Sequence, residues 1–178
     1  LAGFAGAGVM LLAAFVWRER RAEEPFVDPL LFRRRLFLAA NTGGFFGMAA
    51  LYSASAYVPL LVRGVREGSP QAAGLALMPL SLGWVAASIV GGRMLLRTGY
   101  RPTTALGTVC IAAGGFGLAT LTAAASDMRL YSTLALMGIG LGLAMTGFIV
   151  AVQGAAPPGR MGIITSSVLF FRSLGAAV

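Results

Sequence analysis

The chain has 178 residues, of which 57% are hydrophobic and only 11% are charged, and its mean hydropathy is +0.82. A soluble domain carries roughly 25% charged residues. The composition therefore excludes an ordinary soluble enzyme, a disordered segment and a soluble nucleic-acid-binding protein, despite the net charge of +8. One cysteine and no histidine exclude a disulfide scaffold and argue against a His/Cys metal site. What remains is a polytopic membrane protein.

Six apolar blocks follow one another along the chain. About 20 helical residues cross the ~30 Å hydrocarbon core of a bilayer, and every backbone N–H and C=O must be satisfied there within the segment. The blocks are therefore predicted to be transmembrane helices. The first and the last are expected to be truncated, which makes the chain a fragment of a longer protein. The expected helices are 1–17, 36–62, 71–92, 103–123, 130–152 and 162–178.

Local signals support these boundaries. Ser69 followed by Pro70 is typical of a helix start, with an N-cap and then proline at the first helical position. The run 157–159, Pro-Pro-Gly, predicts a break after the fifth helix. The second block would be about 40 Å long as a helix, so we expect it to tilt or to bend near Pro59.

The arginines sort by connection. All 14 basic residues are arginine, and ten of them lie in the segments 18–35, 93–102 and 153–161. Three lie in the alternate connections, as Arg63, Arg66 and Arg129. Short arginine-rich loops stay in the cytoplasm, so the first three segments are predicted to be cytoplasmic loops of a plasma-membrane protein. The positive charge then indicates contact with anionic membrane lipid, with no nucleic acid as partner.

The segment 92–101 carries the strongest local pattern. Its glycines, Gly92 and Gly99, allow a tight turn, and Arg97 and Arg101 could reach carboxylates or helix C-termini. The plainer interpretation is a basic loop with no further role. Both interpretations remain open from these residues alone.

This segment resembles the loop motif of the major facilitator superfamily, Gly-x-Leu-Ala-Asp-Arg-x-Gly-Arg-Lys. Gly92, Arg97 and Gly99 match, whereas Leu96 stands where the family has Asp. Three further stretches resemble the fourteen-helix drug:proton antiporters of that superfamily, and all four keep the family's order and spacing. These stretches are 28–37, 69–83, and 151–153 together with 171–175.

The resemblance implies a fold and a domain organisation. The chain would be a partial major-facilitator-like helical bundle, an all-α integral membrane protein covering roughly helices eight to thirteen. Residues 1–17 would be a truncated transmembrane helix, 18–35 a cytoplasmic loop, and 36–178 the bundle of the C-terminal half. The missing N-terminal half of the same chain would be its partner.

One face of the second block is a candidate substrate surface. Its aromatic, thioether, amide and hydroxyl groups recur at spacings of four and three, as expected for one stripe on a helix. Such a mixture suits the binding of bulky apolar molecules, and the resemblance implies that this helix lines a central cavity. Packing against neighbouring helices is the alternative. The stripe consists of Asn41, Phe45, Met48, Tyr52, Ser55 and Pro59.

The fifth block offers weaker candidates for the same pathway, namely Met137, Leu141 and Phe148. Gln153 lies near its end and could bond the segment that carries Arg172, or simply cap the helix. Two glycine pairs, Gly43/Gly47 and Gly138/Gly142, predict close approach between helices.

Arg172 is predicted to lie inside the sixth block. If this helix enters hydrocarbon near Gly162, Arg172 lies ~15 Å deep, where a charge is costly and is usually functional. A helix start near Ser166 would instead allow Arg172 to snorkel to the interface. In either case the guanidinium needs an acceptor.

These features favour a secondary transporter that exports a hydrophobic or cationic small molecule against inward proton flow, by alternating access. The sequence has no catalytic set and no metal site, so we expect no enzyme and no cofactor other than the proton gradient. The coupling carboxylate would lie in the missing half. The alternatives are a channel, a membrane-embedded enzyme, or a polytopic sensor or assembly subunit that does not transport.

Overall fold

The structure is a computed structural model that describes residues 10, 17–18, 35–65, 67–122, 125–157, 159 and 161–178. The first expected helix, 1–17, and nearly all of the expected loop 18–35 lie outside the described residues. Every regular element in the described part of the chain is a helix, which confirms the predicted all-α class.

Four spans in this part are long and apolar enough to cross a membrane. The first is α3, Arg35–Leu60, which continues as a π-helical turn, Leu61–Val65. The second is made of α4, Pro70–Leu75, and α5, Met78–Thr98. The third and fourth are α6, Tyr100–Ala119, and α7, Asp127–Gly154. A shorter apolar helix, α8, covers Met161–Ala177.

The helix boundaries differ from the sequence-based ones in an informative way. The expected loop 93–102 is helical except at Gly99, because α5 continues to Thr98 and α6 begins at Tyr100. Hydropathy locates where a segment leaves the lipid, but a helix can continue into the polar interface, where Arg97 in the last turn of α5 suits the negative end of the helix dipole.

The last turn of the first span and the first turns of the second span are also irregular. Pro59 lies inside α3, and the chain changes to the π-helical turn directly after Leu60. Because proline has no N–H and its ring crowds the preceding turn, such irregularity is expected beside it. The expected helix 71–92 is likewise interrupted at 76–77, immediately before Pro79 in the first turn of α5.

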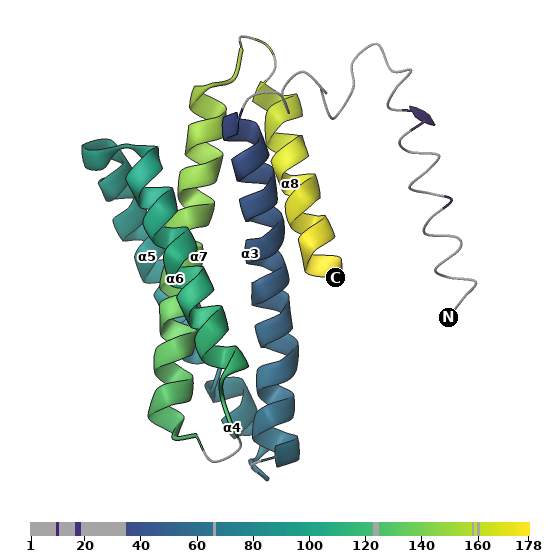
Figure 1. Cartoon of the computed structure of the whole chain (residues 1–178), viewed down its shortest axis with the longest axis vertical. Coiled ribbons are helices and arrows are strands. Elements are labelled where there is room, and N and C mark those ends of the chain that lie inside the picture. The colour runs from purple at the N-terminus through teal and green to yellow at the C-terminus, as the bar shows by residue number, and fades with distance from the viewer. Residues whose placement is uncertain are drawn as a thin grey trace.

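Helix α7 lies at the centre of the described bundle. It packs mainly against α5 and α6, and it also contacts α3 and α8, while α3 and α8 pack against each other (Figure 1). In its most apolar stretch 67% of the residues are buried, compared with 17–22% in the other three spans. The outer helices therefore present most of their apolar side chains away from the bundle.

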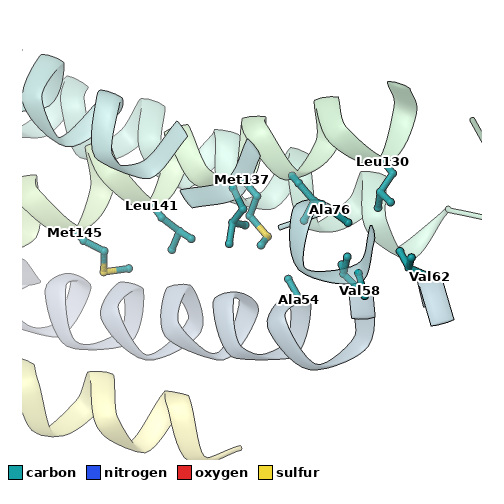
Figure 2. Close-up of a cluster of buried hydrophobic side chains, with 11 residues drawn as sticks. Ala54, Val58, Val62, Ala76, Leu130, Met137, Leu141 and Met145 are labelled. Carbon is teal, nitrogen blue, oxygen red and sulfur yellow. The ribbon is translucent and has the colours of Figure 1, made fainter. Parts of the chain in front are cut away.

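The core between α7 and α3 is built from flexible and small apolar side chains. Met137, Leu141 and Met145 of α7 point toward α3, whose Ala54 and Val58 belong to the same buried cluster (Figure 2). Methionine adapts its shape to irregular gaps, which suits a contact made without aromatic side chains.

Glycines allow α5 and α6 to pack closely against α7. A Cβ added at Gly142 would lie 2.5 Å from the carbonyl oxygen of Trp84 on α5, and one added at Gly140 would lie 2.5 Å from the backbone nitrogen of Ile111 on α6. Gly138 meets the backbone of Leu80 in the same way. The close approach predicted for Gly138/Gly142 is therefore confirmed. At both glycines the backbone of α7 lies against the backbone of α5.

The described arginine-rich segments share one end of the bundle. The start of α3, the corner between α5 and α6, and the connection from α7 to α8 lie at the upper end in Figure 1. The π-helical turn, α4 and the connection from α6 to α7 lie at the opposite end. The alternation deduced from charge thus agrees with the arrangement of the helices, whereas the side of the membrane that each end faces stays a prediction.

Candidate functional site

The first part of the predicted α3 stripe faces α8. Asn41 is only 3% exposed, and Phe45 is half-buried with its ring edge-to-face on Phe46 at 5.2 Å between centroids. The backbone of Phe45 meets Gly175 of α8 so closely that no Cβ fits there. Among the described residues, Asn41 and Phe45 therefore lie at a helix–helix contact and not at an open cavity.

The second part of the stripe is more accessible. Met48 and Pro59 are half-buried, and Tyr52 is 52% exposed. The Ser55 hydroxyl donates to the carbonyl oxygen of Leu51 at 2.9 Å, so it satisfies itself within its own helix. Tyr52 is thus the stripe residue that a ligand reaches most easily in the described structure.

The candidates on α7 lie in the core. Met137 and Leu141 are fully buried, and Met137 packs against Gly114 of α6. The ring of Phe148 covers Gly43 of α3, where an added Cβ would lie 2.5 Å from the ring. In the described structure these three side chains pack between helices, and they do not form a common surface with Tyr52.

Gln153 connects α7 to α8. Its Nε2 donates to the hydroxyl of Thr165 at 3.4 Å, a long hydrogen bond that is partly shielded from solvent. Thr165 in turn donates to the carbonyl oxygen of Met161 at 2.9 Å. Of the two roles considered for Gln153, the described structure therefore shows a contact with the segment that carries Arg172.

Replacing Gln153 with leucine is expected to loosen this contact by a small amount. Interhelical hydrogen bonds in membranes average roughly 0.6 kcal/mol, so the thermal midpoint should fall by no more than a few degrees. Thermal unfolding of the purified full-length protein measures the effect. A matched Ser173→Ala variant should not change the midpoint, because that hydroxyl bonds Leu169 within α8. An equal loss in both variants would contradict the assignment.

Arg172 lies against α3. Helix α8 begins at Met161, so about 16 Å of helix precede Arg172, and a start near Ser166 is not seen. Arg172 is half-buried, and a Cβ added at the buried Gly44 would lie 3.0 Å from its Cγ and 3.7 Å from its Cδ. Its aliphatic stem thus occupies the space that a side chain at position 44 would need.

The residues of the 92–101 pattern form a helical corner. Gly92 is inside α5 with no atom close to an added Cβ, and Gly99 has φ 82° and ψ 176°, a conformation that is open essentially to glycine alone. Arg97 and Arg101 are exposed, in the last turn of α5 and the first turn of α6. Leu96, at the position of the family's Asp, is 90% exposed.

Arginines from two helices line a hollow at this end of the bundle. Arg101 and Arg35, with Thr104 and Phe148, line a hollow of about 270 Å³ between α3, α6 and α7. The end of the bundle that is predicted to be cytoplasmic therefore carries arginines along this hollow as well as in the segments that connect the helices.

A larger apolar hollow, of about 600 Å³, lies between α3, the π-helical turn, α6 and α7. Of the predicted pathway residues, only Met137 lines it. Its α3 wall is a second stripe on the opposite face of the helix, which was not predicted from the sequence. The spacing 4, 3, 4 was the available signal, through Ala50, Ala54, Tyr57 and Leu61.

The described residues contain no group of three or more His, Cys, Asp or Glu side chains that could hold a metal ion. Their acids are Glu67, between the π-helical turn and α4, and Asp127, at the start of α7. These elements lie at the end of the bundle opposite the start of α3 (Figure 1). Within this part of the chain the candidate chemistry is recognition by apolar, amide and guanidinium groups.

Comparison with known proteins agrees with this architecture. The family model of the Major Facilitator Superfamily matches residues 1–178. The multidrug transporter protein MdtP of Bacillus subtilis is 31% identical over 92% of this chain and 30% of its own length. Multidrug resistance protein 3 of the same organism is 26% identical over 91% of this chain and 32% of its own length. The efflux pump mlcE of Penicillium citrinum is 27% identical over 98% of this chain and 32% of its own length.

The chain therefore spans about a third of the length of these relatives. Their names are those of transporters and efflux pumps and not of enzymes. Together with four helices apolar enough to cross a bilayer, the match along the whole chain identifies a multi-pass membrane protein: the chain belongs to the Major Facilitator Superfamily.

Proposed function

We propose that the full-length protein is a secondary transporter that exports hydrophobic or cationic small molecules by alternating access. The similarity to transporters named for multidrug resistance and efflux, along nearly the whole chain, carries this proposal. The alternatives are a channel and a subunit that senses or assembles without transport. The experiment below distinguishes them from a transporter.

The packing of the bundle supports a moving scaffold. Helices α5 and α6 approach α7 closely at glycines, and close contacts at small residues suit helices that shift against each other. The accessible Tyr52 and the apolar hollow of about 600 Å³ offer surfaces that an apolar molecule could contact.

The proton gradient is the proposed driving force. A proton-coupled carrier needs a titratable group in the membrane whose pKa changes between states. The acids of the described residues are Glu67, in the connection before α4, and Asp127, the first residue of α7. We therefore assign the coupling carboxylate to the N-terminal half of the full-length protein, which is the partner of this bundle. The arginine-rich end would face the cytoplasm and the anionic lipid of the plasma membrane.

Reconstituted full-length protein tests this function. Liposomes with an internal pH-sensitive dye receive a cationic dye substrate such as ethidium, with a proton gradient of either direction. The expected result is substrate flux that moves protons in the opposite direction and stops when a protonophore collapses the gradient. Flux that is indifferent to the gradient would exclude proton coupling, and no flux of any labelled substrate would favour the subunit that does not transport.

A further inference from the structure

Asn41 has a buried oxygen that no described residue satisfies. Among the described residues, its Oδ1 is the one fully buried side-chain oxygen or nitrogen without a hydrogen-bond partner. The residue is 3% exposed and lies six positions into α3. A buried amide carbonyl without a partner is costly and is rare in folded proteins, so a donor for this oxygen is to be expected nearby.

Arg172 is a donor in the same contact. Its stem packs on Gly44, at 3.0 Å from Cγ to an added Cβ, and Gly44 lies three positions after Asn41 on the same face of α3. No hydrogen bond or ion pair joins the Arg172 guanidinium to another described residue. Guanidinium has five N–H donors and no acceptor, and the amide oxygen is an acceptor, so the two unsatisfied groups are complementary.

The register of α3 and α8 directs the guanidinium toward Asn41. The two helices start at the same end of the bundle and run in parallel (Figure 1). Gly44 contacts Arg172, and the next residue, Phe45, contacts Gly175, which comes later on α8. Earlier on both helices, Phe37 and Ala40 share a buried cluster with Ile164 and Val168. Asn41 therefore lies at about the level of Val168, one turn before Arg172.

Helical side chains lean toward the N-terminus of their helix and cover the preceding turn. A long side chain at position 172 thus extends over the turn of Val168, which is the level of Asn41. The carboxylates of the described residues do not compete for it, since Glu67 and Asp127 lie at the opposite end of the bundle.

We propose that Arg172 and Asn41 form an interhelical hydrogen bond inside the membrane, in which the guanidinium donates to Asn41 Oδ1 and holds α8 on α3. Asn41 is in this sense a positioning residue for Arg172. The proposal concerns the bundle itself and does not depend on which molecule is transported or on proton coupling.

A double-mutant cycle in the full-length protein tests the pair. The thermal midpoint in detergent is measured for Asn41→Leu, Arg172→Leu and the double variant. We expect the two effects to be non-additive, with the double variant at least about 2 °C more stable than the sum of the single losses. The reason is that Asn41→Leu removes the acceptor of the half-buried guanidinium and Arg172→Leu leaves the buried Oδ1 without a donor, whereas the double variant removes both groups.

A neighbouring hydroxyl provides the matched control. Thr42 follows Asn41 on α3 but donates to the carbonyl oxygen of Leu38 at 2.8 Å within its own helix. Thr42→Val and Arg172→Leu should therefore combine additively. Additivity of Asn41→Leu with Arg172→Leu would overturn the pair and would leave Arg172 to a ligand or to another segment of the protein.

Asn41→Asp supplies a second readout in case Asn41→Leu does not yield folded protein. A carboxylate opposite a guanidinium forms a stronger, charge-assisted bond, so this variant should be at least as stable as the natural protein. In the Arg172→Leu background the same carboxylate would be buried without a partner, and the midpoint should fall by several degrees. Equal effects of Asn41→Asp in both backgrounds would likewise overturn the proposal.

Discussion

Replacing Gly142 with leucine in the full-length protein is expected to cause a large loss of stability. An added Cβ would lie 2.5 Å from the carbonyl oxygen of Trp84 and 2.8 Å from the backbone nitrogen of Ser88. Backbone atoms of a packed helix cannot rotate away as a side chain can, so α5 would have to separate from α7. Leucine is a better helix former than glycine and is more hydrophobic, so a loss of stability would be caused by the added volume.

Overpacking in a core typically costs 1–3 kcal/mol, and we expect at least about 3 kcal/mol at this contact. The fraction of monodisperse protein after detergent extraction and its thermal midpoint measure the loss. Gly115→Leu is the matched control, because Gly115 is also in a long helix but has no atom within 4 Å of an added Cβ and lines the larger hollow. If both variants behave alike, the close contact of α5 with α7 is wrong.

Gly99→Ala is expected to have the second largest effect, and its sign is opposite to that of Gly92→Ala. Gly99 is the single residue between α5 and α6, and its φ of 82° with ψ of 176° is a conformation in which a Cβ costs about 1–3 kcal/mol. The helical corner would have to refold locally to accept alanine. The thermal midpoint should fall by a few degrees.

Gly92 makes the comparison sharp, because it belongs to the same pattern and is also replaced by one methyl group. It lies inside α5, and an added Cβ meets no atom within 4 Å. Alanine is the better helix former by about 0.5–1 kcal/mol, so Gly92→Ala should be neutral or stabilising. A loss of stability at Gly92 similar to that at Gly99 would show that the pattern is needed for something other than the turn.

Several features of this protein follow from its sequence alone. Transfer of apolar side chains out of water and the need to satisfy backbone hydrogen bonds are properties of each segment by itself. Length and hydropathy were therefore enough to predict the helical class and, in the described part of the chain, four helices able to cross a membrane and the shorter helix α8. The spacing of Arg35, Arg97 and Arg101 along the chain likewise indicated which connections share an end, because each span reverses the direction of the chain.

Tertiary structure decided which neighbour each face has. In a membrane both the lipid-facing and the core-facing sides of a helix are apolar, so the stripe through Asn41 and Tyr52 could be recognised as one face but not assigned to a cavity or to α8. The contact of Arg172 with Gly44 and the hollow beside Tyr57 arise between segments far apart in sequence. A local sequence pattern does not specify such contacts, since they depend on how the helices pack against one another.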